Sequence, residues 1–235
     1  MLVLVVGANG ATGQHVVDLL LRQGVEVRAI VRSLGALADH PNLYKIKASV
    51  HDLDRSEMAT HTKGCTAVVS CLGHNLSFKG LFGKPRLLVT DTLQCICSAI
   101  IDSEPADAVK VILMNSTGVS NQDIPEKPQL SQRIVVAILR GLLPPHVDNE
   151  NAADYLRTHI GQGHQAIEWV AVRPDALVDE DKVTEYTVHD SPIRNAIFDS
   201  GATSRINVGK FMTELILNKE TWLKWKGKMP VIYNK

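Results

Sequence analysis

Three glycines near the N-terminus have the spacing of a phosphate-binding turn. Gly7, Gly10 and Gly13 form a Gly-x-x-Gly-x-x-Gly pattern in the run Gly-Ala-Asn-Gly-Ala-Thr-Gly. The free N–H groups and the positive dipole end of a helix's first turn attract a pyrophosphate. Glycine is required where such a turn bends sharply and the phosphates contact bare backbone. These residues therefore predict dinucleotide binding, provided that a strand precedes the turn and a helix follows it.

Two residues beyond the next apolar segment distinguish NAD from NADP. Arg32 and Ser33 follow the strand-like residues 26–31. An acidic residue there would accept hydrogen bonds from the ribose hydroxyls and repel a 2′-phosphate. A guanidinium followed by a hydroxyl instead suits a phosphate dianion, although an ordinary solvated arginine is the alternative. We expect NADP(H) to be preferred over NAD(H).

Strands alternate with helices along the chain, as positioning such a site requires. The run Leu2–Val6 predicts a buried strand, and a helical period covers residues 15–22. Further strands are expected at 26–31, 43–47, 67–71, 109–114, 168–172 and 231–233, and helices after Asp52 or Asp54, at 85–102 and at 208–217. This alternation predicts an α/β protein, a Rossmann-type doubly wound parallel sheet with helices on both faces.

The predicted substrate pocket lies in loops that follow strand ends. We expect one NAD(P)-binding domain over residues 1–235, with pocket elements at about 119–165 and 175–206. Residues 74–84 and 119–129 are loop-like, and ligands of open α/β sheets bind outside the carboxyl ends of the strands. His74 would lie at the pocket mouth, where a solvated histidine is commoner than a catalytic one.

Composition excludes several classes of protein. Net charge is zero and no basic run is present, so the electrostatic footprint of a nucleic-acid binder is missing. The apolar run 134–139 is too short to span a bilayer, and the first residues lack the basic region of a signal peptide. The four cysteines show neither metal nor redox spacing, so we expect no metal site. A cytoplasmic protein with reduced thiols is the expectation.

Several motifs together resemble a known family. The runs Val-Val-Gly-Ala-Asn-Gly-Ala-Thr-Gly, Ala-Ile-Val-Arg-Ser, His-Asp-Leu, Ser-Cys-Leu-Gly and Trp-Val-Ala-Val-Arg-Pro resemble landmarks of atypical short-chain dehydrogenases. Within that group the chain is most similar to NmrA-like and biliverdin-reductase-B/flavin-reductase-like proteins, over residues 2–233. The resemblance implies a nicotinamide cofactor bound along the carboxyl edge of the sheet.

The resemblance also implies a role for each matching position. The implied contacts are Asn9, Gly10, Ala11, Thr12 and Gly13 for the pyrophosphate, Arg32 and Ser33 for the 2′-phosphate, Asp52 and Leu53 for the adenine, Cys71, Leu72 and Gly73 for the adenosine ribose, Ser116 and Thr117 for the nicotinamide, and Arg173 and Pro174 under its ring.

The chain departs from the family in its expected proton donor. Short-chain dehydrogenases usually carry Tyr-x-x-x-Lys after the fifth strand, but the first tyrosine here is Tyr155, with His159 four residues later. This pair is either a degenerate dyad or part of an ordinary surface helix. Where flavin-reductase-like relatives place a lysine or histidine, this chain offers Ala153 and Asp154.

Two classes of function follow from these residues. The first is an NADPH-dependent reductase of a small conjugated acceptor (a flavin, a quinone or a tetrapyrrole-like molecule), because such acceptors can take their proton from solvent. Ser116 is then the candidate catalytic side chain, with a hydroxyl that caps the strand end as the alternative. The second class is a non-catalytic NADP(H)-binding redox sensor of the NmrA type, which would bind a protein partner. Trp222 and Trp225, among lysines, are either a partner surface or the apolar side of a short helix.

Overall fold

The protein is built around an eight-stranded, mostly parallel sheet. The computed structural model describes residues 1–74, 83–126, 135, 138, 140, 143–195 and 198–235. The strand order is β3-β2-β1-β4-β5-β6-β10-β8, and β8 is antiparallel to β10 while every other neighbouring pair is parallel. The strands are β1 (Leu2–Val6), β2 (Glu26–Val31), β3 (Leu43–Lys47), β4 (Ala67–Ser70), β5 (Val109–Met114), β6 (Ile167–Pro174), β8 (Tyr186–His189) and β10 (Val231–Asn234). This order is that of a Rossmann fold, which confirms the predicted architecture.

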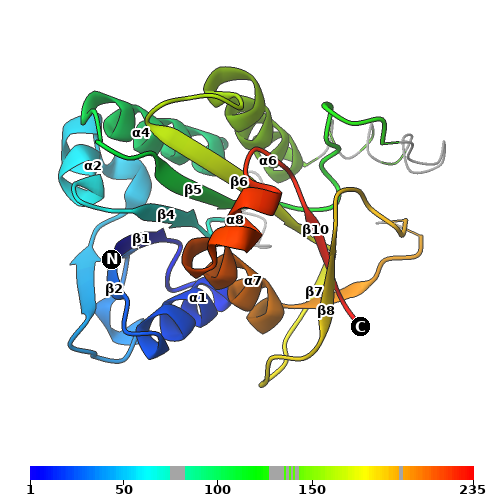
Figure 1. Ribbon diagram of the computed structural model, residues 1–235, viewed down its shortest axis with the longest axis horizontal. Helices are drawn as coiled ribbons and strands as arrows, with labels where there is room; N and C mark the ends of the chain where they lie inside the picture. Colours follow the sequence, from blue (N-terminus) through cyan, green and yellow to red (C-terminus); the bar gives the residue numbers. More distant parts are fainter. Residues whose placement is uncertain (75–82, 127–134, 136–137, 139, 141–142, 196–197) are drawn as a thin grey trace.

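Helices cover both faces of the sheet (Figure 1). One face carries α1 (Ala11–Arg22), α7 (Arg205–Leu217) and α8 (Lys219–Trp225), and the other carries α2 (Arg55–Thr62), α4 (Leu88–Asp102) and α6 (Pro144–Tyr155). The fully buried side chains of β1 alternate between the two layers, Val3 and Val5 on the first face, Leu4 and Val6 on the second. A strand that is buried on both faces is apolar at every position, which is why β1 could be predicted from the sequence.

Most predicted boundaries agree with the structure to within one residue, and four differ by more, one of them the start of α7 at Arg205, three residues before the predicted start. Helix α1 starts at Ala11, earlier than the predicted helical period, because Gly10 is already its N-cap. Helix α4 starts at Leu88, so Pro85 belongs to the preceding segment and not to the first turn. Strand β6 extends to Pro174, two residues past the predicted end, so Arg173 lies within the strand.

The segment after β6 adds elements that the sequence did not indicate. Strands β7 (Ala176–Val178) and β9 (Ala202–Ser204) form a separate two-stranded parallel sheet within the predicted pocket segment 175–206. Of the two predicted wall loops, residues 75–82 and 127–129 lie outside the described residues, as do residues 134, 136, 137 and 139 of the apolar run. No helix in the described part of the chain is long and apolar enough to cross a membrane.

The two tryptophans of α8 pack inward. Trp222 and Trp225 are each 3% exposed, and the indole N–H of Trp222 donates to Glu168 on β6. The ammonium of Lys110 lies 4.8 Å from the centre of the Trp222 ring. The pair therefore fastens α8 to the sheet, and the partner-surface interpretation is not supported.

Candidate functional site

The glycine turn connects β1 to α1 and is crowded on one side. Gly7 has φ of +73°, and a Cβ atom there would lie 2.6 Å from the carbonyl of Cys71. A Cβ atom on Gly13 would lie 2.2 Å from the carbonyl oxygen of Gly7. Gly10 differs, because its nearest neighbour would be the Gly7 oxygen at 3.1 Å. The protein's own backbone thus requires glycine at positions 7 and 13, while Gly10 is exposed and leaves its turn open to a ligand.

A cavity of about 520 Å³ opens beside this turn. It lies at the carboxyl edge of β1, β2, β3 and β4, where the strand order reverses and where open α/β sheets bind ligands. Its lining residues are Gly7, Ala8, Asn9, Gly10, Ile30, Val31, Arg32, Ala48, Ser49, Val50, His51, Cys71, Leu72, Gly73, His74, Gly83, Lys84, Pro85 and Leu88.

The polar groups around the cavity fit the phosphates and hydroxyls of a dinucleotide. The exposed guanidinium of Arg32 lines the rim, and none of the described residues accepts a hydrogen bond from it. The amide of Asn9 donates to the Ser33 carbonyl at 2.8 Å, and its buried Oδ1 has no partner among the described residues. No described side chain caps the first turn of α1. Free donors and one free acceptor therefore border the cavity.

The structure brings together seven of the predicted cofactor contacts. Gly7, Asn9, Gly10, Arg32, Cys71, Leu72 and Gly73 all line the cavity. Ala11, Thr12 and Gly13 form the first turn of α1 directly beyond it. Burial raises the pKa of the Cys71 thiol to about 12, so this cysteine contributes as a neutral, apolar wall.

The two residues predicted to contact the adenine do not line the cavity. Asp52 and Leu53 are not among the lining residues, and the four residues before them, 48–51, are. The Asp52 carboxylate instead pairs with His51 Nε2 at 2.9 Å, and Leu53 packs against the buried core. The sequence signal for residues 48–51 was their position at the end of β3, which parallels the position of Arg32 at the end of β2.

Ser116 and Thr117 lie together at the end of β5. The side chain of Asn115 accepts from the Ser116 N–H at 2.8 Å and donates to the Asn149 carbonyl of α6 at 2.9 Å. Ser116 Oγ accepts from the Gly118 N–H at 3.1 Å, and Thr117 donates to Asp175 at 3.2 Å. The Ser116 hydroxyl therefore caps the end of β5, the structural alternative considered for it, yet the residue is only half-buried at the sheet edge.

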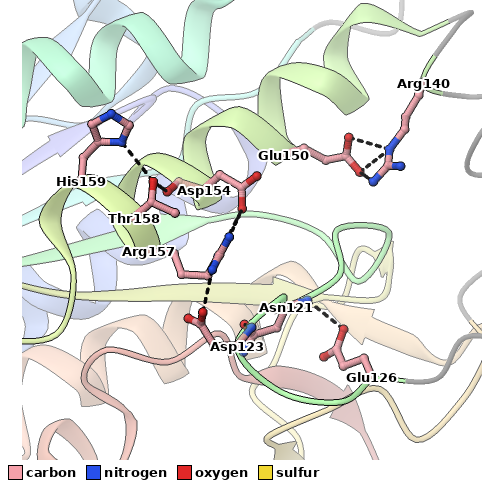
Figure 2. Close-up of polar contacts among 9 residues, drawn as sticks. All are labelled: Asn121, Asp123, Glu126, Arg140, Glu150, Asp154, Arg157, Thr158 and His159. Atoms are coloured by element: carbon pink, nitrogen blue, oxygen red, sulfur yellow. Dashed lines mark hydrogen bonds and ion pairs between the residues drawn. The ribbon is translucent and has the colours of Figure 1, made fainter.

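A histidine that the sequence interpretation missed faces Ser116. A Cβ atom on Gly118 would lie 3.5 Å from both Ser116 Oγ and His146 Cε1, so hydroxyl and imidazole border the same spot. His146 Nε2 is 3.3 Å from Glu150 Oε1, one helical turn further along α6. Arg140 in turn donates to both carboxylate oxygens of Glu150 at 2.8–2.9 Å (Figure 2).

The electrostatics of His146 favour its neutral form. Burial lowers the pKa of the imidazole below the usual 6.5, and the nearby Arg140 charge lowers it further. The Glu150 carboxylate opposes both effects but does not outweigh them. The available sequence signal was the spacing His146-x-x-x-Glu150, which has the same period as the Tyr-x-x-x-Lys motif sought in the chain.

The Tyr155–His159 pair lies at the opposite end of α6. The two rings stack with centroids 5.2 Å apart, and nine residues of α-helix, roughly 13 Å, separate Tyr155 from His146. Burial raises the pKa of the Tyr155 hydroxyl, which disfavours a phenolate. Of the other two candidates on this helix, Ala153 is buried and Asp154 pairs with Arg157 (Figure 2). None of these four positions joins the end of β5.

His74 is anchored and not a solvated loop residue. Its Nε2 lies 2.7 Å from Asp148 Oδ2, and its side chain is 5% exposed. Asp148 is fully buried and also accepts from the backbone N–H groups of Val89 and Thr90 at 2.8 and 2.9 Å. One carboxylate of α6 therefore holds both the first turn of α4 and the histidine that lines the cavity.

The side chain of Arg173 is fully used inside the protein. Its five N–H groups donate to the carbonyls of Met229, Val119 and Asp190 and, twice, to the Glu126 carboxylate, at 2.7–3.2 Å. The adjoining Pro174 is buried, and its carbonyl accepts from the Thr117 N–H. The guanidinium therefore fastens the loop after β5. Its side chain is not available to a ligand, so at this position only the backbone at the end of β6 could lie under the nicotinamide.

The loop after β5 is held at a second point. Asp123 accepts from Arg157 at 2.6 Å, and Glu126 also accepts from the Asn121 N–H at 2.8 Å (Figure 2). The loop is thus tied to the helical turn Leu156–Ile160, which follows α6, as well as to β6. Elsewhere in the described residues the four cysteines are free, and no three side chains converge in a manner suited to a metal ion.

Strand order, glycine turn and cavity define a dinucleotide-binding protein of Rossmann type. The chain belongs to the NAD(P)H-binding family, whose profile matches residues 7–219. This membership confirms the resemblance to NAD(P)-binding dehydrogenases and makes a nicotinamide dinucleotide the cofactor class. No curated protein matches the sequence.

Solved structures share the fold at low sequence identity. An oxidoreductase, ylbE, from Lactococcus lactis has a TM-score of 0.70 at 18% identity, over 100% of this chain and 91% of that chain. A candidate NADH-flavin reductase, SP1627, from Streptococcus pneumoniae TIGR4 has a TM-score of 0.69 at 17% identity, over the whole of both chains. A candidate NAD-dependent epimerase/dehydratase from Bacillus halodurans has a TM-score of 0.69 at 21% identity, over 100% and 94%.

Proposed function

We propose that the protein is an NADPH-dependent reductase of a small conjugated acceptor: a flavin, a quinone or a tetrapyrrole-like molecule. The observation that carries the proposal is the unpaired Arg32 guanidinium on the rim of the cavity, at the end of β2 and beside the glycine turn. A dianionic 2′-phosphate is the natural partner of a free guanidinium at this position. Bound NADPH would supply the hydride.

The chain's own residues bind and orient the cofactor. The N–H groups of Ala11, Thr12 and Gly13 would hold the pyrophosphate, and Arg32 with Ser33 the 2′-phosphate. Residues 48–51 would flank the adenine and Cys71–Gly73 the adenosine ribose. Ser116, Thr117 and the end of β6 would then border the nicotinamide.

The acceptor would lie between the loop after β5 and the segment 175–206. The loop is fastened by Arg173 and Arg157, so its wall is pre-organised, and hydride transfer depends chiefly on such positioning. The similarity in fold to a candidate NADH-flavin reductase supports a flavin as one of the acceptors to test.

Cofactor titration followed by acceptor turnover tests the proposal. Calorimetry should show tighter binding of NADPH than of NADH, and a panel of flavins and quinones should include one that accelerates NADPH oxidation. Ser116→Ala should slow the hydride-transfer step while NADPH affinity changes little. Equal affinity for the two dinucleotides would contradict the role of Arg32, and an inactive panel would contradict the reductase assignment.

One observation favours a second candidate, an NADP(H)-binding redox sensor that acts through a protein partner. The tyrosine that resembles the acid of short-chain dehydrogenases lies at the far end of α6, stacked on His159. Tight NADPH binding with no oxidation by any acceptor would favour this sensor.

A further inference from the structure

We propose that His146 is the proton donor to the reduced acceptor and that Glu150 holds its ring in the donating orientation. The inference rests on the reductase function proposed above and assigns a residue to the step for which that function named none. It replaces the missing tyrosine of the Tyr-x-x-x-Lys pattern with a histidine on the same helix.

The orientation of the imidazole supports this role. The Nδ1–Cε1 edge faces the β5 loop, since Cε1 and Nδ1 lie 3.5 and 3.7 Å from the Cβ position of Gly118. Nε2 points the other way and lies 3.3 Å from Glu150 Oε1, an electrostatic contact whose angles fall short of a hydrogen bond. The ring therefore presents Nδ1 to the spot that Ser116 Oγ also borders.

Proton and electrons balance with this arrangement. The acceptor takes a hydride from NADPH, which is oxidised to NADP⁺, and the resulting anion takes the Nδ1 proton of the imidazolium. The N–H bond on Nδ1 breaks and a new bond to hydrogen forms on the acceptor. The neutral ring left behind carries its proton on Nε2, the tautomer that the Glu150 carboxylate stabilises. Solvent then restores the proton on Nδ1.

The absence of a side chain at Gly118 keeps the donor accessible. An alanine methyl there would meet Ser116 Oγ and His146 Cε1 at 3.5 Å, which is ordinary van der Waals contact and demands no shift of the backbone. The same methyl would occupy space beside both groups that an acceptor needs. Gly118→Ala is thus a steric test that spares the fold.

The donor must be protonated, so its titration should appear in the rate. Among the described residues, the charged groups that face His146 are Glu150 on its own helix and Arg140, and the β5 loop opposite contributes the neutral Ser116 and Gly118. Turnover should rise as pH falls toward and through the pKa of His146, which burial holds below the usual 6.5.

Kinetics of matched variants test the assignment. His146→Gln should lower the single-turnover rate about 100-fold and flatten the pH profile between pH 5.5 and 8, with NADPH affinity unchanged. Exogenous imidazole should restore part of the rate to His146→Ala. His159→Gln, an exposed histidine at the far end of the same helix region, is the control and should retain the wild-type rate.

A second readout does not depend on turnover. The Cε1–H proton resonance of His146 is assigned by its absence in His146→Gln. The pKa that this resonance reports should lie below the usual value, and it should be lower still in Glu150→Gln. Binding of an oxidised acceptor beside NADP⁺ should move this resonance in the wild type and less in Gly118→Ala.

Failure of the inference differs from failure of the proposed function. Wild-type turnover that survives in His146→Gln with the same pH profile overturns the role of His146 and leaves the reductase standing. If the wild-type protein fails to oxidise NADPH with every acceptor tested, the reductase function itself is overturned, and the donor role with it.

Discussion

Gly10 and Gly13 stand three residues apart in one turn, yet different neighbours restrict them. An alanine at Gly13 would push its Cβ into the Gly7 carbonyl, so Gly13→Ala should lower the free energy of unfolding of the free protein by about 1–3 kcal/mol. Gly10→Ala adds a methyl 3.1 Å from the Gly7 carbonyl oxygen, a tight contact that a shift of a few tenths of an ångström relieves. It should lower the melting temperature of the free protein much less than Gly13→Ala does, while abolishing NADPH binding.

Thermal melts with and without NADPH measure both effects. Wild type should gain about 2.7 kcal/mol at a ligand concentration of 100 Kd, and Gly10→Ala should gain nothing. Normal NADPH binding by Gly10→Ala would mean that the turn is an ordinary strand–helix connection.

Arg32 offers the most direct test of cofactor preference, because none of the described residues forms an ion pair or hydrogen bond with its guanidinium. Arg32→Asp should weaken NADPH binding by about 1.5–3 kcal/mol, roughly 10- to 150-fold, the scale of a charge-assisted hydrogen bond. NADH binding should change little, since NADH lacks the 2′-phosphate. Arg22→Gln, at an exposed arginine on α1, is the control, and calorimetry is the measurement. An equal loss for both dinucleotides would place Arg32 near a group that they share.

At the scale of elements, the loop after β5 depends on one buried ion pair. Glu126 and Arg173 are 6% and 0% exposed at the side chain, so Glu126→Leu leaves a buried guanidinium without its carboxylate. We expect a loss of about 3–5 kcal/mol in the free energy of unfolding, measured by denaturant titration. Asp123→Asn removes the exposed ion pair of the same loop and should cost less than about 1 kcal/mol.

Equal losses for the two variants would mean that Arg173 finds other acceptors when Glu126 is gone. The double variant Arg173→Met/Glu126→Leu separates these cases, because removing both charges should recover part of the stability lost in Glu126→Leu.

The same scale shows what sequence reasoning could and could not reach. Strand β1, the glycine turn and Arg32 are contiguous, and period-2 or period-3.6 patterns identify contiguous elements well. His146 and Ser116 are thirty residues apart in the chain, and they lie close together only because the start of α6 packs beside the end of β5. No periodicity encodes such a contact. The five hydrogen bonds of Arg173 likewise join segments that are distant in sequence, so its structural role was invisible beside its place in a motif.

The search for the Tyr-x-x-x-Lys motif by residue type also led to the wrong end of α6. A search for tyrosine led to Tyr155, which packs against α4, whereas the spacing of the motif was present in His146 and Glu150 with different side chains. The cavity wall likewise contains residues 48–51 and neither Asp52 nor Leu53, because the cavity follows the end of β3 and not the helix cap.

For the whole molecule, the acid limb of the stability curve should include Glu168. Burial raises the pKa of this carboxyl, but hydrogen bonds from Lys226 and Trp222 and the charges of Lys226 and Lys110 outweigh burial and hold it below 4.5. A carboxyl whose pKa is lower in the folded state stabilises the protein above pH 4.5. That contribution is lost as pH falls through the folded-state pKa.

Glu168→Gln should therefore flatten the decline of the free energy of unfolding below pH 4.5. Urea titrations between pH 3 and 6 measure this slope, and Glu26→Gln, an exposed glutamate at the start of β2, is the control. A slope unchanged in Glu168→Gln would show that the attachment of α8 to β6 does not depend on this charge.

The position of β10 within the sheet has a kinetic consequence. This strand lies between β6 and β8, although the chain makes it well after both. Among the described strands β8 pairs with β10 alone, so it stays undocked until residues 231–234 are in place. During synthesis the strands β1 to β6 emerge before residues 231–234, so they can pair while β10 is still missing. We therefore expect the β1–β6 part of the sheet to collapse first. Protection of the β8 and β10 amides in pulsed hydrogen exchange should appear together and last, leaving the open edge of β6 as the region through which nascent chains associate.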